Sequence, residues 1–139
     1  MNDLIINEDI NIENLIYEIR NKQVMLDSDL AKLYRVETKR INEAVKNNPL
    51  KFPERFSWKL NDYESKEFLV ENFDQKIETR GGKYKNPRVF TEQGVAMLAT
   101  ILKSDIATQV SIKIMDTFIS MRHYIGNSEY RLNLLLNKI

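Results

Sequence analysis

The chain has 139 residues, of which 42% are hydrophobic and 29% charged, and its formal net charge is +1. This length predicts a single folded domain. The absence of cysteine and the presence of one histidine exclude a disulfide framework and most zinc or triad sites, so we expect neither a metal nor a cofactor. No apolar run approaches the roughly 20 residues of a membrane helix, and the N-terminus lacks the basic start of a secretory signal. We therefore expect a cytoplasmic protein.

The charges are segregated along the chain although their sum is close to zero. The first 19 residues hold five acids and no base, whereas residues 20–59 hold ten bases against five acids. A second basic segment, residues 80–88, holds four bases and no acid. Local basic surfaces, and not the net charge, govern phosphate binding. We divide the chain into an acidic extension (1–14), a domain (15–125) and an amphipathic helical tail (126–139).

The segment "LIYEIRNKQVML" has apolar residues on both sides of the polar pair Asn21-Lys22, which predicts two short strands joined by a tight turn. Asp27 or Ser28 is expected to cap a helix that begins near Asp29.

The next stretch, "LAKLYRVETKRINEAVKNN" (30–48), has the spacing of a helix-turn-helix. Apolar residues share one face in each of two short helices, namely Leu30, Leu33 and Tyr34, then Ile41, Ala44 and Val45. We expect Thr38 to cap the second helix, which leaves a connection of three residues with Val36 packed between the helices. Such turns often have glycine where this chain has Arg35, because one residue tends toward a left-handed conformation.

The remaining segments complete an α+β pattern. Alternation over residues 56–60 predicts a strand, Asn61 and Glu64 have the spacing of a capping box, and Gly81-Gly82 predicts a hairpin turn. The helix that begins at this capping box is expected to have Tyr63, Phe68, Leu69 and Phe73 as its apolar residues. Thr91 is expected to cap the first of two long helices, and Gly126 is expected to close the second. We therefore expect small β elements and a helix-turn-helix segment packed on two long C-terminal helices.

Two basic segments are candidates for contact with DNA. On the second short helix the candidates are Thr38, Lys39, Arg40, Asn42 and Lys46. The later basic segment is expected to form the tip and arms of the Gly81-Gly82 hairpin, and its candidates are Arg80, Lys83, Lys85 and Arg88. Lysine and arginine suit phosphates and guanine acceptors, asparagine suits the adenine N6/N7 edge, and a helix N-terminus suits phosphate. The alternative for either segment is a solvated charged surface, since most charge runs are simply exposed.

Catalysis is not expected. His123 has no nucleophile or metal-ligand partner at a motif spacing, and acid pairs such as Glu64 and Glu67 lie on an amphipathic surface. The segment "GGKY" lacks the spacing and the Ser or Thr of a phosphate-binding loop.

The strings "VMLDSDLAKLY", "VETKRINEAVK" and "FTEQGVAML" together resemble the ORF6N domain, a relative of the KilA N-terminal and Bro N-terminal domains of phages and large DNA viruses. The resemblance spans roughly residues 16–122. It implies DNA binding, often in prophage regulators or antirepressor-like proteins with a variable, frequently helical C-terminal part. It places the helix-turn-helix on residues 30–48.

Together these observations predict a double-stranded DNA-binding transcriptional regulator of phage or mobile-element type. One such module reads few base pairs, so we expect a homodimer. The tail offers four apolar residues for dimerisation: Leu132, Leu135, Leu136 and Ile139. The alternative is an antirepressor-like module that binds a repressor or another regulatory protein and not DNA. A nuclease would need clustered carboxylates for metal ions, and the sequence suggests no such cluster.

Overall fold

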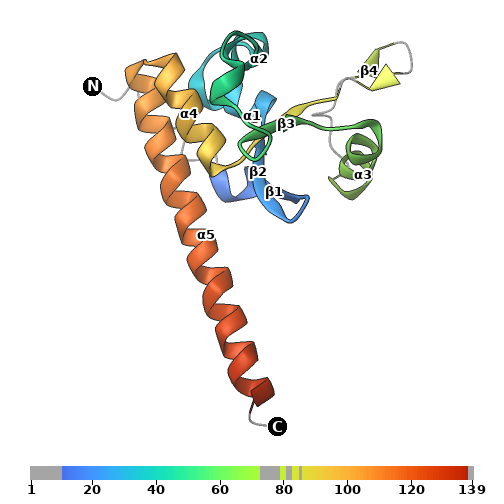
Figure 1. Cartoon of the computed structure of the whole chain (residues 1–139), viewed down its shortest axis with the longest axis vertical. Coiled ribbons are helices and arrows are strands. Elements are labelled where there is room, and N and C mark those ends of the chain that lie inside the picture. The colour runs from blue at the N-terminus through green and yellow to red at the C-terminus, as the bar shows by residue number, and fades with distance from the viewer. Residues whose placement is uncertain (1–10, 73–78, 81–82, 85, 138–139) are drawn as a thin grey trace.

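A computed structural model of the chain describes residues 11–72, 79–80, 83–84 and 86–137, with side chains described for residues 11–71 and 86–122. Within these ranges the chain folds as a mixed α+β domain with a small antiparallel sheet between two helical layers (Figure 1). The expected fold class is therefore confirmed.

The sheet has four strands in the order β1-β2-β6-β3, all antiparallel to their neighbours. The strands are β1 (Ile16–Ile19), β2 (Lys22–Leu26), β3 (Ser57–Lys59) and β6 (Arg88–Phe90), and a short 3-10 helix, η1 (Ile12–Leu15), precedes them. The expected first hairpin is confirmed, but its turn lies one residue earlier than the pair Asn21-Lys22. Arg20 and Asn21 occupy it with φ values of 57° and 60°, the left-handed pair that a tight two-residue hairpin requires.

Alternate side chains of the strands enter two separate cores, because successive residues of a strand point to opposite faces. On one face Met25 and Phe90 join the main core, which also contains Leu30, Ile41, Leu98, Ile114 and Phe118. On the other face Val24, Leu26 and Val89 pack with Trp58, Leu60 and Phe68. The helix α3 (Asp62–Asn72) covers this second face through Phe68.

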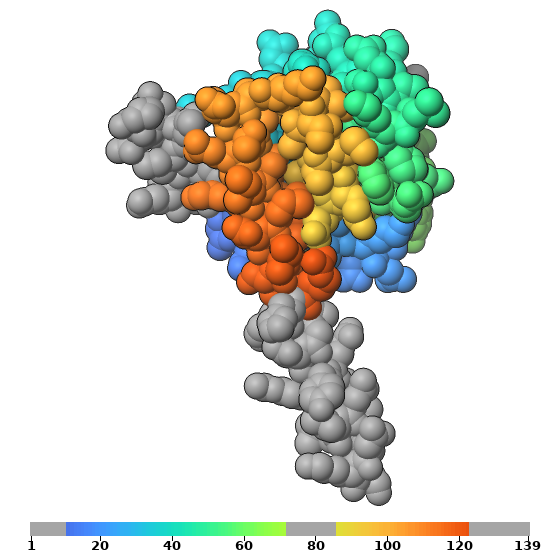
Figure 2. All heavy atoms as spheres, turned by 60° about the vertical axis from the view of Figure 1, so that its left-hand side comes forward, coloured from blue at the N-terminus to red at the C-terminus, as the bar shows by residue number. Residues whose placement is uncertain are grey.

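Four helices cover the main core: α1 (Asp27–Tyr34), α2 (Thr38–Asn47), α4 (Glu92–Leu102) and α5 (Asp105–Asn137). A 3-10 turn, η2 (Pro49–Lys51), follows α2. The helices α4 and α5 lie side by side on one face of the molecule, as expected for the long C-terminal pair (Figure 2). A buried hydrogen bond of 2.7 Å between the Tyr34 hydroxyl and Ser111 Oγ ties α1 to α5. Burial raises the pKa of Tyr34 to about 12, against a smaller opposing effect of that hydrogen bond.

The helix α5 does not end at Gly126, so that expectation was wrong. It continues as one helix of 33 residues to Asn137 and extends well beyond the rest of the fold (Figure 1). A glycine inside a helix costs only about 1 kcal/mol relative to alanine, so a single glycine weakens a helix without ending it. The dimerisation candidates Leu132, Leu135 and Leu136 fall on this C-terminal part of α5, whereas Ile139 lies outside the described residues.

The predicted N-caps of α3 and α4 are confirmed, whereas the predicted N-cap of α2 is wrong. The capping box of α3 is confirmed, because Glu64 N donates to Asn61 Oδ1 (2.8 Å) and Asn61 N to Glu64 Oε1 (3.0 Å). The Thr91 cap is also confirmed, through Gly94 N and Thr91 Oγ1 (3.3 Å). Thr38 does not cap α2, since it is the first helical residue after Glu37.

Neither Asp27 nor Ser28 caps a helix that begins near Asp29. The helix α1 already begins at Asp27, directly after β2, and Leu26 is its N-cap residue. Tyr63, expected to be an apolar member of α3, is 72% exposed, and Phe73 lies outside the described residues.

The start of α4 is fixed against the segment before β3. Thr91 N donates to Phe56 O (2.9 Å), and Thr91 Oγ1 lies 3.1 Å from both Arg55 O and Phe56 O. A Cβ atom at Gly94 would lie 2.1 Å from Phe56 O, so only glycine allows this approach. The contact sets the position of the chain that leads into β3.

Candidate nucleic-acid interface

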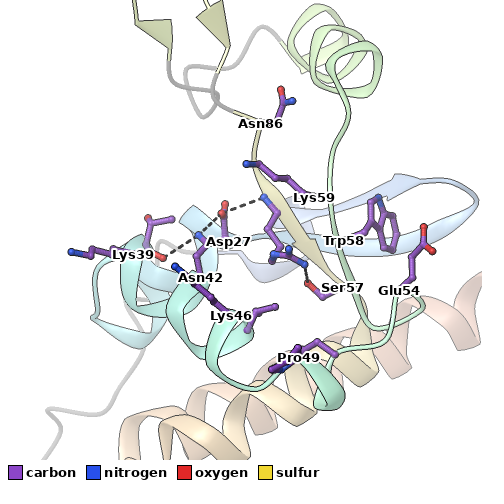
Figure 3. Close-up of a pocket in the computed structure, with 14 residues that line it drawn as sticks. Asp27, Lys39, Asn42, Lys46, Pro49, Glu54, Ser57, Trp58, Lys59 and Asn86 are labelled. Atoms are coloured by element: carbon purple, nitrogen blue, oxygen red, sulfur yellow. Dashed lines mark hydrogen bonds between the residues drawn. The ribbon is translucent and has the colours of Figure 1, made fainter.

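A groove of about 870 Å³ separates α2 from the β3 and β6 strands (Figure 3). One wall is the polar face of α2, the other is formed by β3 and β6, and one end is closed by η2. The groove brings together residues that lie up to 61 positions apart in the sequence, from Asp27 to Arg88.

The helix α2 presents its polar side to the groove because its apolar side is anchored in the core. Its buried residues are Ile41, Ala44 and Val45, as the sequence predicted. Four of its predicted DNA-binding residues, Thr38, Lys39, Asn42 and Lys46, line the groove. Arg40 is exposed but does not line the groove, so the structure separates it from the other four.

The facing wall holds two further bases, one of which was not among the DNA-binding residues predicted from the sequence. Lys59 of β3 and Arg88 of β6 are partners in the antiparallel register, and both line the groove. The alternation of residues 56–60 indicated that Lys59 faces away from the second core, but the pairing of β3 with β6 could not be deduced from it. Arg88 was expected in an arm of the later hairpin, and this was wrong, because it belongs to the central sheet.

A hydrogen-bond network around Asp27 connects the two walls. Asp27 Oδ2 accepts from Asn42 Nδ2 (2.9 Å) and from the backbone N of Arg88 (3.2 Å), while Oδ1 accepts from the backbone N of Ser28 (2.8 Å). Asp27 is only 6% exposed. Arg88 Nη1 also donates to Ser57 Oγ (3.2 Å). The carboxylate of Asp27 therefore links α2 to β6. The sequence had predicted a different role for it, as a helix cap.

Basic side chains outnumber acidic ones in the groove. The bases Lys39, Lys46 and Lys59 are exposed and Arg88 is half-buried, whereas the two acids are Asp27 and Glu54. Burial lowers the pKa of Arg88, and the Asp27 carboxylate partly opposes this shift. An arginine remains charged under these conditions. The excess of cations favours an anionic ligand.

The second acid, Glu54, is engaged by Arg20 at the groove's outer edge. Arg20 Nη1 lies 3.1 Å from Glu54 Oε1, and its Nε lies 2.7 Å from Glu64 Oε2. The hydrogen bond from Arg20 lowers the pKa of Glu64. The same guanidinium lies 4.8 Å from the centre of the Trp58 ring. This arrangement offsets the charge of Glu54 and leaves the groove lysines in excess.

The connection between α1 and α2 has the predicted three residues. Arg35 adopts the left-handed conformation (φ 59°, ψ 43°) that glycine more often supplies in such turns, at a cost of roughly 1 kcal/mol. Val36 N donates to Ala31 O (3.0 Å), and the Val36 side chain is partly buried against the main core, as predicted. The helix-turn-helix geometry thus forms without a glycine.

The hairpin of the second basic segment lies beyond the end of the groove that is opposite Pro49 (Figure 3). The predicted hairpin is confirmed as β4 (Thr79–Arg80) paired with β5 (Lys83–Tyr84), while Gly81, Gly82 and Lys85 lie outside the described residues. Its strands are seen beyond Asn86, which lines the groove (Figure 3). Asn86 bonds to Asp62 and Ser65 of α3, which anchors the chain at the base of the hairpin.

Two further properties of the described residues bear on the site. Among residues with described side chains, no group of three or more His, Cys, Asp or Glu residues is arranged to hold a metal ion. No helix in the described ranges is long and apolar enough to cross a membrane.

Comparison with known proteins identifies a domain family. The family model described as the ORF6N domain matches residues 14–101, which run from within η1 to the last turn of α4. The match leaves out α5, although the resemblance read from the sequence extended to residue 122. No curated protein and no solved structure matches the chain.

Proposed function

The chain belongs to the ORF6N domain family, and from this premise and the basic groove we propose that it binds double-stranded DNA. The observation that carries the proposal is the convergence of Lys39, Lys46, Lys59 and Arg88 on one groove beside a helix-turn-helix. Phosphates are the ligands that such a cluster attracts most strongly.

In the proposed complex, α2 enters the major groove and one DNA strand passes along the protein groove. Lys59 and Arg88 meet phosphates from the sheet side, and Thr38 at the start of α2 meets a phosphate through the helix N-terminus. Lys39, Asn42 and Lys46 face the base edges. The protein binds and does not catalyse.

The proposal extends to regulation. We propose that two copies occupy a palindromic operator and thereby alter transcription in a phage or mobile-element switch, by analogy with the family. The dimer forms through the part of α5 that extends beyond the domain, where Leu132, Leu135 and Leu136 recur at helical spacing.

A salt series on matched charge variants tests DNA binding. The variant Lys46→Ala/Lys59→Ala removes one lysine from each wall, and Lys66→Ala/Lys113→Ala removes two exposed lysines from outside the groove. Binding is followed by the anisotropy of a dye-labelled pool of random duplexes. We expect wild type and the control to share a steep negative slope of log K against log salt. The groove variant should lose about 0.9 from that slope, for the phosphate contact of Lys59, and should lose further affinity because Lys46 no longer contacts a base.

Two results would overturn the proposal. Wild type that fails to bind at low salt would favour the antirepressor-like alternative, in which the module binds a regulatory protein. An equal decrease of affinity and salt slope in the two variants would show that DNA is attracted to the protein surface in general and not to a site in the groove.

The dimer is tested by sedimentation equilibrium. We expect wild type to sediment as a dimer and Leu132→Lys/Leu135→Lys to sediment as a monomer, because lysine at both positions opposes an apolar helix pair. The matched variant Lys113→Ala should remain dimeric. A wild-type monomer at tens of micromolar protein would contradict this part of the proposal.

A further inference from the structure

The side-chain amide of Asn42 has both of its hydrogens engaged inside the protein. Asn42 Nδ2 donates to Asp27 Oδ2 (2.9 Å) and to Thr38 O (3.2 Å). Both partners are acceptors, a carboxylate and a backbone carbonyl, so the amide nitrogen must face them and the amide cannot be flipped. Asn42 nevertheless lines the groove.

The Asp27 carboxylate, which accepts a hydrogen bond from Asn42, is itself held in position by other contacts. Asp27 is buried, and its carboxylate also accepts from the backbone N–H groups of Ser28 and Arg88. Releasing Asn42 would leave part of a buried carboxylate without a donor, which costs more than an ordinary hydrogen bond. The amide nitrogen therefore stays engaged when a ligand enters the groove.

Only the amide oxygen of Asn42 then remains for a ligand. The usual contact of asparagine with adenine uses the nitrogen as a donor to N7 and the oxygen as an acceptor from N6. Asn42 has no free donor for N7, so this two-bond contact is closed to it. A single acceptor can take a hydrogen bond from the amino group of adenine or of cytosine, but at adenine it leaves N7 without a donor from Asn42. At cytosine the amino group is the one hydrogen-bonding group in the major groove, so a single acceptor satisfies it completely.

The neighbouring lysines complete the pattern of a C·G pair. Lys39 and Lys46 lie three residues before and four residues after Asn42, on the same side of α2, and both line the groove. Their ammonium groups are donors, and guanine presents two acceptors, O6 and N7. We propose, on the basis of the DNA-binding function above, that Asn42 reads the cytosine amino group of a C·G pair through Oδ1. The Asp27 carboxylate is the positioning group that sets this specificity.

The test begins with selection from a random duplex library by the full chain. Selection is run in parallel with wild type, Asn42→Ala and the matched control Arg40→Ala, an exposed residue of α2 outside the groove. Thermal unfolding of each variant reports whether it is folded. We expect one C·G position that is enriched by wild type and Arg40→Ala but becomes degenerate with Asn42→Ala.

The second step uses wild-type protein, so it does not depend on the stability of a variant. The cytosine at that position is replaced by N4-methylcytosine, which keeps base pairing but puts a methyl group where the amino hydrogen faces the major groove. We expect affinity to fall roughly three- to tenfold, the effect of one lost hydrogen bond. Methylation at a cytosine outside the selected position should change little.

The outcomes separate this inference from the proposed function. DNA binding with an A·T pair at the Asn42-dependent position, and weakening by 7-deazaadenine, would show the two-bond contact and overturn the inference alone. Binding with no position that depends on Asn42 would also overturn it and leave a structural role. Failure of wild type to enrich or bind any duplex would overturn the proposed function as well.

Discussion

The two basic segments of this chain, one on α2 and the other on the β4–β5 hairpin, are anchored very differently. The helix α2 buries Ile41, Ala44 and Val45 in the main core, and a buried carboxylate ties its polar face to β6. The strands β4 and β5 have two residues each and form a separate two-stranded sheet, paired with each other. A two-stranded hairpin has little intrinsic stability in water.

This difference suggests a division of labour within a DNA-binding surface. Reading a base requires donors and acceptors held in position, whereas a phosphate contact depends mainly on charge. We therefore expect base preference to come from the α2 groove and the hairpin to add affinity through phosphates. Three predictions test the two sides of this comparison: the first two concern the packing that holds the groove and its helices in place, and the third concerns the hairpin.

The largest expected effect comes from the contact that positions the sheet wall of the groove. Gly94→Ala should destabilise the protein by roughly 3 kcal/mol. The Cβ atom of the alanine would lie 2.1 Å from the carbonyl oxygen of Phe56 and would push α4 away from the segment that precedes β3. Urea unfolding followed by circular dichroism measures this. The neighbouring exposed Gln93→Ala should change stability by less than about 0.5 kcal/mol. Equal stability of the two variants would mean that the wall is not fixed by this contact.

A smaller effect concerns the anchoring of α1, and it appears only at high pH. Burial raises the pKa of Tyr34 to about 12, above its ordinary value of 10.0. The unfolded chain loses this proton first, so the stabilising contribution is complete below pH 10 and is lost as pH rises toward 12. The full loss, reached only above pH 12, amounts to roughly 2–3 kcal/mol, and about half of it falls between pH 9 and pH 11.

Urea unfolding at pH 9 and pH 11 measures this dependence. Tyr34→Phe should remove most of the fall in stability that wild type shows between the two values. The control Tyr63→Phe should keep the fall, because that side chain is 72% exposed. A wild-type protein equally stable at both pH values would contradict a buried, protonated Tyr34.

The smallest expected effect concerns the hairpin and sharpens the comparison most directly. Arg80→Ala/Lys83→Ala should lower the salt slope of DNA binding by up to about 1.8 and leave the selected base sequence unchanged. Selection from the same random library, together with the salt series, measures both quantities. A changed base preference would show that the hairpin reads bases, and the proposed division of labour would fail.

The local elements of the fold were largely predictable from the sequence because they depend on short-range patterns. Spacings of three and four residues identified the buried faces of α1 and α2, and the pair Asn61–Glu64 marked the start of α3 correctly. The three-residue turn at Arg35 was also recognised, since the apolar periodicity breaks there and resumes after it.

The features that were missed depend on contacts between distant residues. Asp27 was interpreted as a helix cap, but its partners Asn42 and Arg88 lie 15 and 61 residues away, and no local pattern indicates them. Lys59 was missed because its place in the groove follows from pairing with Arg88 across two strands. The helix end at Gly126 was misplaced because a glycine weakens a helix without ending it.

The position of Trp58 has a practical consequence. It is the only tryptophan of the chain, it lines the groove, and the guanidinium of Arg20 lies against its ring. Indole emission responds to nearby charges and to stacking partners, so a ligand that displaces Arg20 or enters the groove would change the intrinsic fluorescence of the protein. The unlabelled chain thus carries its own optical reporter at the surface where we place its ligand.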